Sequence, residues 1–144
     1  MGILDVKLFV YFIGRPKDNH ANAIATDFIE RAARFTACEM REINPAKFDI
    51  VSRHPSARKI FLDPLGKELD SHHFSKILDT ASMQGQDLVF LIGGHEGLTP
   101  EMRRQADLLL SLGRMTWPHE LARAMLVEQI YRGFAILKNH PYVR

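Results

Sequence analysis

Three short segments carry residue types that could surround a small ligand, because glycine or proline follows an apolar run in each. They are Asp63-Pro64 with Gly66, the stretch Gly93-Gly94-His95-Glu96-Gly97, and the stretch Gly113-Arg114-Met115-Thr116-Trp117-Pro118. Glycine lets a ligand approach the backbone closely, since it has no Cβ and tolerates positive φ. Any one of these segments alone could merely turn the chain. Together they predict one ligand site, provided that the fold brings them to the same edge.

Several common binding and catalytic motifs are missing from the sequence. The first apolar run is followed by Gly14-Arg15-Pro16-Lys17 and not by Gly-x-Gly-x-x-Gly, so an ordinary dinucleotide site is not expected. There is no Walker loop, no Gly-x-Ser-x-Gly turn and no His-Glu-x-x-His helix. The seven histidines lack the spacing of metal ligands, and His72-His73 is more typical of a solvated helix start. We therefore expect no metal.

Size and composition set limits on the function. With 144 residues, 46% of them hydrophobic, we expect one domain spanning 1–144. A formal net charge of +2 does not by itself indicate a nucleic-acid partner, so RNA binding must be argued from local residues. The single cysteine, Cys38, can form no internal disulfide, and the apolar runs are too short to cross a bilayer. We expect a soluble protein of the reducing cytoplasm, not attached to a membrane.

Apolar runs alternate with helical periodicities along the chain, which predicts an α/β fold with a largely parallel sheet. Strands are expected at 6–13, 40–43, 60–62, 87–92 and 108–112. Helices are expected at 20–36, 71–83, after Thr99-Pro100, and at 120–138. Asp63-Pro64 should end the third strand, Ser71 should cap the second helix, and 44–58 should be irregular. Ligands of such sheets bind beyond the carboxyl ends of the strands, where the three segments lie.

The helical periodicity also predicts which side chains are buried. In the first helix the buried stripe is expected at Ile24, Phe28, Ala32 and Phe35. In the last helix it is expected at Leu121, Met125, Ile130, Phe134 and Leu137.

Four ordered motifs in the second half of the chain resemble one family. They are Leu91-Ile92-Gly93-Gly94-x-Glu96-Gly97-Leu98, Pro118-His119-x-Leu121-x-Arg123, Glu128-Gln129-Ile130-Tyr131-Arg132 and Asn139-His140-Pro141-Tyr142. The chain is similar in these motifs to the ribosomal RNA large subunit methyltransferase H family, which methylates N3 of a pseudouridine in 23S ribosomal RNA. The likeness is densest from Asp87 to Arg144. His95, Val143 and a short 44–58 segment depart from the family pattern.

The resemblance implies a SPOUT-type fold, in which a mostly parallel sheet is flanked by helices and the C-terminal part forms a trefoil knot. It also implies a homodimer that uses S-adenosyl-L-methionine as its cofactor. The residues implied to hold the cofactor are Leu62, Gly94, Gly113, Arg114, Met115, Thr116, Trp117 and Pro118. Backbone amides and carbonyls between apolar walls suffice for this cofactor, because it has no pyrophosphate. Trp117 could equally belong to the core, where lone tryptophans are usually buried.

The catalytic candidates are His119, Glu96, Arg132 and Tyr142. Methyl transfer mainly requires alignment of the base nitrogen with the methyl group, so no covalent nucleophile is needed. His119 or Glu96 could accept the N3 proton, although both also suit an ordinary helix start. Arg132 could instead pair with Glu128, four residues earlier on the same helix. The resemblance implies that Tyr142 lies in a C-terminal tail that helps to complete the partner subunit's active site.

Contacts with RNA are expected from Arg15, Lys17, Arg123, His140 and Arg144. Arginine side chains suit phosphate oxygens because their planar fork of donors matches them. The expected substrate is 23S ribosomal RNA within the assembled ribosome, since a small and weakly basic surface would bind naked RNA poorly. Two alternatives stay open: another SPOUT methyltransferase that acts on transfer RNA or on a ribose hydroxyl, and a ribosome-associated binding protein without catalysis.

Overall fold

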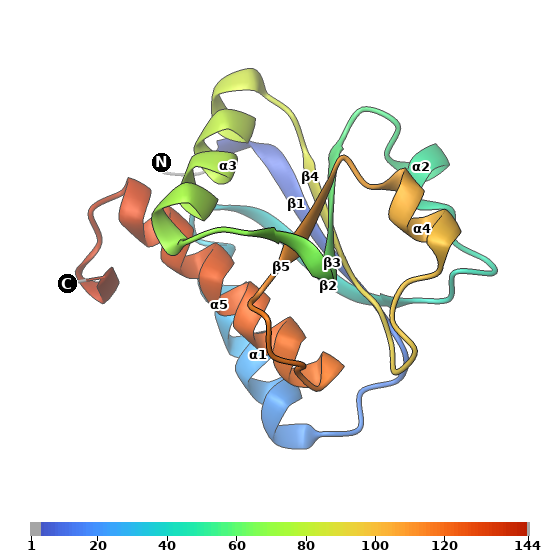
Figure 1. Ribbon diagram of the computed structural model, residues 1–144. Helices are drawn as coiled ribbons and strands as arrows, with labels where there is room; N and C mark the ends of the chain where they lie inside the picture. The colour runs from blue at the N-terminus through green and yellow to red at the C-terminus, as the bar shows by residue number, and fades with distance from the viewer. Residues whose placement is uncertain (1–3, 144) are drawn as a thin grey trace.

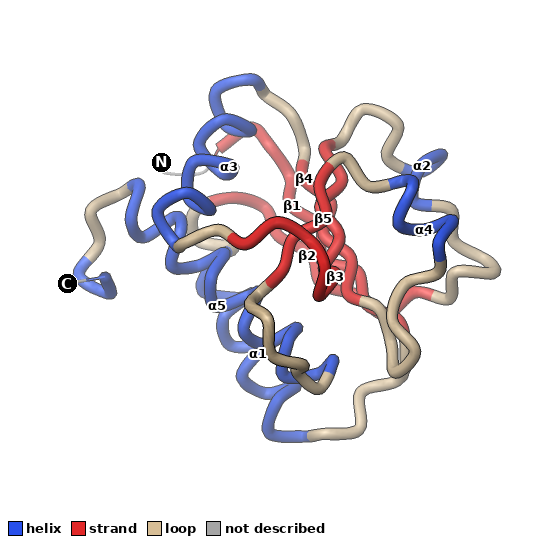
Figure 2. The backbone as a smooth tube through the Cα atoms, in the orientation of Figure 1, coloured by secondary structure: helices blue, strands red, loops and turns tan. Residues whose placement is uncertain are grey.

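The computed structural model of the chain describes residues 4–143, in which strands and helices alternate. The strands are β1 (Leu4–Ile13), β2 (Thr36–Ile43), β3 (Arg58–Glu68), β4 (Leu88–Ile92) and β5 (Leu108–Ser111). The helices are α1 (Asn19–Ala32), α2 (Ile50–Arg53), α3 (Ser71–Gln84), α4 (Pro100–Gln105) and α5 (His119–Leu137), followed by the 3-10 turn η1 (Pro141–Val143). The strands pair in parallel in the order β2-β1-β4-β3-β5 (Figures 1 and 2). The predicted α/β class with a largely parallel sheet is confirmed.

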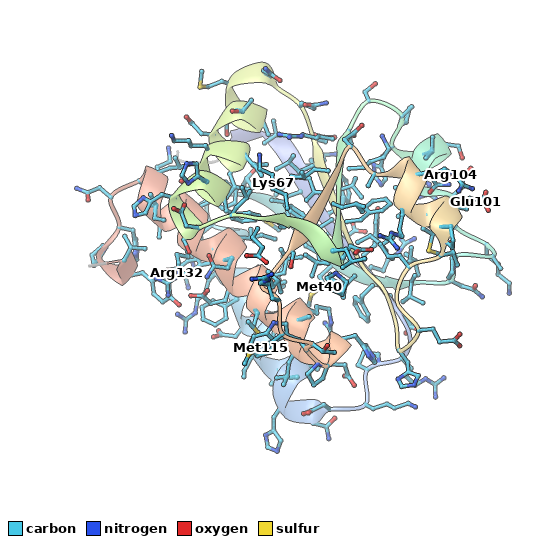
Figure 3. All side chains as sticks on the ribbon, in the orientation of Figure 1. Met40, Lys67, Glu101, Arg104, Met115 and Arg132 are labelled. Atoms are coloured by element: carbon cyan, nitrogen blue, oxygen red, sulfur yellow. The ribbon has the colours of Figure 1, made fainter. Side chains whose placement is uncertain are left out.

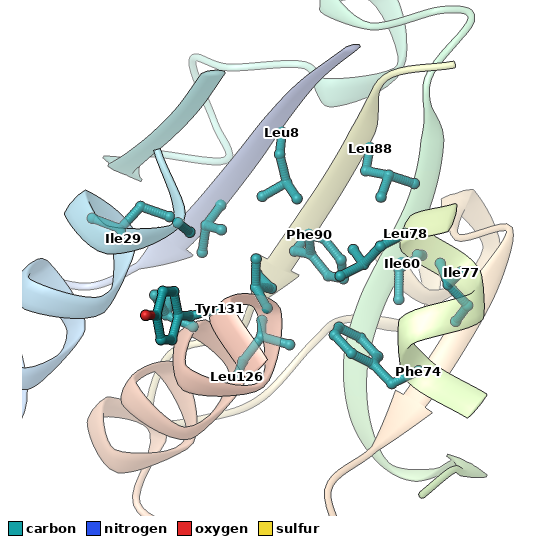
Figure 4. Packing of buried hydrophobic residues seen from close by; sticks show 14 of the residues in the cluster. Leu8, Ile29, Ile60, Phe74, Ile77, Leu78, Leu88, Phe90, Leu126 and Tyr131 are labelled. Atoms are coloured by element: carbon teal, nitrogen blue, oxygen red, sulfur yellow. The ribbon is translucent and has the colours of Figure 1, made fainter. Parts of the chain in front are cut away.

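Helices cover the two faces of the sheet unequally. α1, α3 and α5 lie on one face, and the short helices α2 and α4 lie on the other (Figure 1). The first face holds the larger apolar core, where Leu8 and Phe90 of the sheet pack with Leu126 and Tyr131 of α5 (Figure 4). All five residues of β4 are buried, as the uninterrupted apolar run of this strand predicts. The loops that follow the strands therefore start from a well-packed base.

β3 differs from the prediction, because it does not end at Asp63-Pro64. Leu62 and Lys67 of β3 both pair with Leu110 of β5, so the residues 63–66 form a bulge between them. Beyond the bulge the strand resumes and runs to Glu68. Long-range pairing with β5 overrides the local turn signal, and the extra residues are accommodated as a bulge. The bulge lies beside the end of β5, next to the loop that follows that strand.

α1 is shorter than predicted, and its buried face is rotated. The helix ends at Ala32, whereas Thr36 already begins β2. Ile24, expected to be buried, is 47% exposed. The buried residues of the helix are Ala21, Ala25, Ile29 and Ala32. α1 packs against α5, and the distance between packed helices depends on the side chains at their contact.

Other details of the helices are partly as predicted. Thr99 caps α4, since its Oγ1 accepts the Met102 N–H at 3.2 Å. Asp70 and not Ser71 caps α3, because an aspartate oxygen one residue earlier accepts a backbone N–H of the first turn. Leu121 of α5, expected to be buried, is 41% exposed. No helix within residues 4–143 is long and apolar enough to cross a membrane.

Candidate active site

The three segments rich in glycine and proline meet at one edge of the sheet, as the sequence predicts. They enclose a cleft of about 490 Å³ at the carboxyl ends of β3, β4 and β5, and the start of α5 closes one side. The residues that line the cleft are Leu62, Asp63, Pro64, Ile92, Gly93, Gly94, His95, Gly97, Leu110, Leu112, Gly113, Met115, Thr116, Trp117, Pro118, His119 and Ala122.

Most of the residues predicted to hold a cofactor line this cleft. Arg114 is the exception, since its exposed side chain is not among the lining residues. Trp117 is 39% exposed and therefore does not serve as core packing. Met115 is also exposed and lies near the start of α5 (Figure 3). Both apolar side chains line the cleft and remain accessible to solvent.

Glycines give two walls of the cleft their shape. The loop after β4 closes on itself through a hydrogen bond of 3.0 Å from the Gly97 N–H to the Gly94 carbonyl oxygen. Gly97 has a φ of +76°, a conformation that favours glycine. Gly94 lies against the end of β1, because a Cβ there would be 3.1 Å from the Ile13 carbonyl oxygen. The loop after β4 is thus compact, and it touches the neighbouring strand.

Asp63 is a cleft residue that the sequence analysis missed. It is the one buried carboxylate among residues 6–143, whose side chains the structure describes. Its Oδ1 accepts the Leu65 N–H at 2.8 Å, and its Oδ2 lies 3.0 Å from Nε of Arg103 on α4. Both oxygens are therefore occupied within the protein, and the carboxylate holds the bulge of β3 to α4. The sequence placed the Asp63-Pro64 pair in a ligand-binding segment at the end of a strand, but it assigned no role to the carboxylate itself.

The two candidates for accepting a proton occupy different positions. His119 is the first residue of α5 and lines the cleft, whereas Glu96 is exposed and is not among the lining residues. Within the described part of the chain, no group of three His, Cys, Asp or Glu side chains is placed to hold a metal ion. The ionisable side chains that line the cleft are Asp63, His95 and His119.

Arg132 and Tyr142 form a second cluster together with Glu128, outside the cleft. Oε2 of Glu128 accepts hydrogen bonds from Nη2 of Arg132 at 2.8 Å and from the Tyr142 hydroxyl at 2.6 Å. Glu128 raises the pKa of Arg132, and burial together with Glu128 raises the pKa of Tyr142 to about 12. Arg132 follows His119 on the same helix, and the helical rise separates the two by about 20 Å along the axis. Figure 3 shows Arg132 toward the far end of α5 from Met115.

Sequence comparison identifies the family. The model of the family described as "Predicted SPOUT methyltransferase" matches residues 6–142. The chain belongs to the SPOUT methyltransferase family.

Curated relatives agree with this assignment over nearly the whole chain. The ribosomal RNA large subunit methyltransferase H of Solibacter usitatus is 63% identical over 139 residues, covering 96% of this chain and 100% of that protein. The protein of the same name from Chromobacterium violaceum is 36% identical over 155 residues, covering 96% of this chain and 99% of the relative. The chain is thus a close relative of proteins that carry this name.

Solved structures share the fold at low sequence identity. A putative methylase family protein from Neisseria gonorrhoeae aligns with a TM-score of 0.60 at 9% identity, covering 89% of this chain and 82% of that one. An AdoMet-bound rRNA methyltransferase from Sinorhizobium meliloti aligns with a TM-score of 0.50 at 14% identity, covering 88% of this chain and 56% of that one. At such identities the likeness concerns the fold alone.

The RNA-binding candidates of this SPOUT methyltransferase are not equally accessible. Arg15 and Lys17 are exposed in the loop between β1 and α1, and His140 is half-buried. Arg123 is only 2% exposed, so its side chain is not at the surface of the described chain, and its phosphate contact stays a prediction. Arg144 lies outside the described residues.

The surroundings of Arg123 explain why it is buried. Its Nη2 donates to the Asn22 side-chain oxygen at 2.9 Å, and its guanidinium carbon lies 3.9 Å from the centre of the Phe12 ring. Burial lowers the pKa of Arg123. The guanidinium therefore joins α5 to α1 and β1 inside the protein.

Proposed function

We propose that this SPOUT methyltransferase transfers a methyl group from S-adenosyl-L-methionine to N3 of a pseudouridine in 23S ribosomal RNA, on the assembled ribosome in the cytoplasm. The observation that carries the proposal is the convergence of the three loops on one cleft at the carboxyl edge of the sheet. The names of the relatives that match along the whole chain support the ribosomal RNA substrate. We further propose that the chain acts as one domain spanning 1–144.

The cleft fits the cofactor in size and in chemistry. A volume of about 490 Å³ lies within the range of small-molecule sites, which are mostly apolar with few polar groups. Leu62, Met115 and Trp117 offer apolar walls for an adenine ring, and the backbone of the Gly94 and Gly113 loops offers hydrogen-bonding groups. When bound, the cofactor supplies a methyl group on a positively charged sulfur. The chain's own residues orient this methyl group and exclude water from it.

His119 is the better candidate for accepting the N3 proton. It lines the cleft at the first position of α5, whereas Glu96 faces solvent. A general base has to lie within hydrogen-bond reach of the proton that it accepts. We propose that His119 takes this proton and that Glu96 does not.

A second copy of the chain is proposed to complete the site. The cluster of Glu128, Arg132 and Tyr142 does not line the cleft of its own chain, yet an apolar groove of about 630 Å³ begins beside it. Ile24 and Leu121 line this groove and are exposed although their helical spacing predicts burial. A homodimer that covers the groove would bury both side chains. It would also place the cluster of one subunit near the cleft of the other.

The knotted C-terminal path belongs to the proposal as well. It is supported by family membership, and by the return of α5 from the edge strand β5 across the sheet to pack on α1 and α3. When the unfolded chain is pulled by its two ends, a knot should tighten and keep some residues out of the extended part. The measured end-to-end length should then be less than that of a fully extended chain. Full extension would contradict a knot.

The decisive experiment incubates the protein with 70S particles that lack the modification and with cofactor labelled in the methyl group. Mass analysis of the ribosomal RNA should then find the label on the base of one pseudouridine in 23S RNA. Label in transfer RNA or on a ribose would favour another SPOUT activity. Binding to the particles without any transfer would favour a non-catalytic role.

Complementation tests the composite site. His119→Ala and Arg132→Ala variants should each be inactive as homodimers. A heterodimer of the two, isolated through different tags, should regain activity, because one of its two sites then contains an intact cleft and an intact cluster. An inactive heterodimer would mean that each chain works by itself.

A further inference from the structure

Glu120 connects two segments that lie about a hundred residues apart in the sequence. Its Oε1 accepts the backbone N–H of Lys17 at 2.9 Å and that of Asp18 at 3.0 Å. These hydrogen bonds lower the pKa of Glu120, the bond from Asp18 contributing most. One carboxylate oxygen thus holds the end of the loop between β1 and α1.

The loop that Glu120 holds carries two exposed cations. Residues 14–18 contain Arg15 and Lys17, both exposed, and end at Asp18, which caps α1 through its own side chain. The other end of the loop follows Ile13, whose carbonyl oxygen lies against Gly94 of the cleft. In Figure 1 the loop begins beside the loop after β4 and ends below the start of α5. Each end of the loop therefore contacts a segment that contributes lining residues to the cleft, namely the loop after β4 at one end and the start of α5 at the other.

On the other side, Glu120 is joined directly to the wall of the cleft. It follows Pro118 and His119, which line the cleft, and it lies in the first turn of α5. A shift of the 14–18 loop away from α5 would break both hydrogen bonds. Glu120 thus keeps the backbone that carries the two cations at a fixed place relative to His119.

We propose that Glu120 is a positioning residue that holds Arg15 and Lys17 at the mouth of the cleft, so that both side chains engage phosphates of the substrate RNA. This inference rests on the proposed function. Guanidinium and ammonium groups that are held in place lose less freedom on binding than those on a mobile loop. Glu120 does not touch RNA or cofactor, and it acts through the loop.

A merely structural role for Glu120 has to be separated from this one. An acidic residue in the first turn of a helix stabilises the helix through its dipole, whatever else it contacts. Glu101 provides a matched control, because it is an exposed carboxylate in the first turn of α4 (Figure 3). Replacing Glu101 or Glu120 by alanine removes the same charge from the same helical position. Only the second change releases the loop.

The test compares steady-state methyl transfer to unmodified 70S particles by wild type and by Glu120→Ala, Glu120→Gln and Glu101→Ala. For Glu120→Ala we expect the KM for ribosomes to rise roughly tenfold, as when a charge-assisted hydrogen bond is lost, with kcat and cofactor affinity unchanged. Glu120→Gln retains an oxygen acceptor and should stay within about threefold of wild type, because a neutral acceptor is weaker but still present. Glu101→Ala should leave the KM unchanged.

A double-variant comparison shows whether the effect passes through the loop. Arg15→Ala with Lys17→Ala should raise the KM by itself, and adding Glu120→Ala should then raise it no further. Amide hydrogen exchange of the free protein should show Lys17 and Asp18 protected in wild type and in Glu101→Ala, but unprotected in Glu120→Ala.

Three results would each overturn the proposal. They are an unchanged KM in Glu120→Ala, a full Glu120→Ala effect in the Arg15→Ala, Lys17→Ala background, and a KM unaffected by removing the two cations. The last can be measured with Glu120 intact, so it applies even if Glu120→Ala does not fold. Absence of methyl transfer by wild type would instead refute the proposed function, which distinguishes the two failures.

Discussion

Replacing Asp63 by asparagine should loosen the cleft without changing its volume. Asparagine has the shape of aspartate, but it has one oxygen acceptor and no charge. In the wild type, Oδ1 of Asp63 accepts the Leu65 N–H and Oδ2 pairs with Nε of Arg103. The single oxygen of the asparagine can accept a hydrogen bond from one of these two donors. The second donor then faces the amide NH₂ group, which cannot accept a hydrogen bond. We expect the bulge of β3 to lose its attachment to α4.

The size of the effect follows from burial. Breaking a fully buried ion pair by removing one partner costs about 3–5 kcal/mol. Asp63 is buried, but the Arg103 side chain is 37% exposed, so water partly replaces the lost partner. We therefore expect a loss of about 2 kcal/mol in the free energy of unfolding, in line with hydrogen bonds to charged groups. For a domain of this size that lowers Tm by about 6–8 °C.

Urea unfolding measures the loss, and calorimetry with S-adenosyl-L-methionine measures its consequence for the cleft. We expect roughly fivefold weaker cofactor binding, since the bulge must now be ordered when the cofactor binds. Arg103→Met removes the other partner, and Arg104→Met, at the exposed neighbour on α4 (Figure 3), is the control that should change neither quantity. The Asp63→Asn, Arg103→Met double variant should lose less free energy of unfolding than the sum of the two single losses, by about 1 kcal/mol or more. Strict additivity of the two costs would refute the reasoning.

Three further predictions concern stability and reactivity. Gly66→Ala should lower the free energy of unfolding, measured in urea, by about 2–3 kcal/mol, because the new Cβ would lie 2.6 Å from backbone atoms of Leu109. Gly85→Ala is the control: its new Cβ meets no atom within 4 Å, but the residue has a φ of +64°, so the loss should be only about 1 kcal/mol. Burial, with help from Arg53, lowers the pKa of His54 in the folded protein. The contribution of neutral His54 to stability is therefore present above pH ~6.5 and is lost as the pH falls toward the lowered folded pKa. In His54→Gln, the free energy of unfolding should change less with pH in this range. Burial raises the pKa of Cys38 to about 12, which leaves a thiolate fraction of ~10⁻⁴ at pH 8. Because the thiolate is the reactive form, iodoacetamide should label Cys38 at least about a thousandfold more slowly in the folded protein than in urea.

The sheet and the edge that carries the cleft could be predicted because their signals are local. β4 is a continuous apolar run between polar neighbours, and such a run has few alternatives to a strand that is buried on both faces. Parallel strands place their carboxyl ends together, so the segment 63–66 late in β3 and the loops after β4 and β5 had to share an edge. Thr99 and Pro100 likewise mark the start of α4 by their own chemistry.

The errors arise where tertiary contacts outweigh a local preference. Asp63-Pro64 is a strong turn signal, yet pairing of β3 with β5 on both sides of it makes a bulge. Ile24 is more hydrophobic than Ala21 and Ala25, but the two alanines are buried in the fold whereas Ile24 is half-exposed. Arg123 resembles a surface cation in sequence, and only the fold shows that Asn22 and Phe12 surround it.

The geometry of α5 separates the two groups of catalytic candidates. His119 begins the helix at the cleft, and Arg132 lies about 20 Å further along a rigid rod. No rearrangement of loops within one chain can bring the two together without unfolding α5, which packs on α1 and α3 along the core. If both groups serve one reaction, the second must come from another copy of the chain. The exposed Ile24 and Leu121 beside the Glu128 cluster mark the surface on which that copy would pack, so dimerisation and catalysis should be lost together when Leu121 is replaced by glutamate.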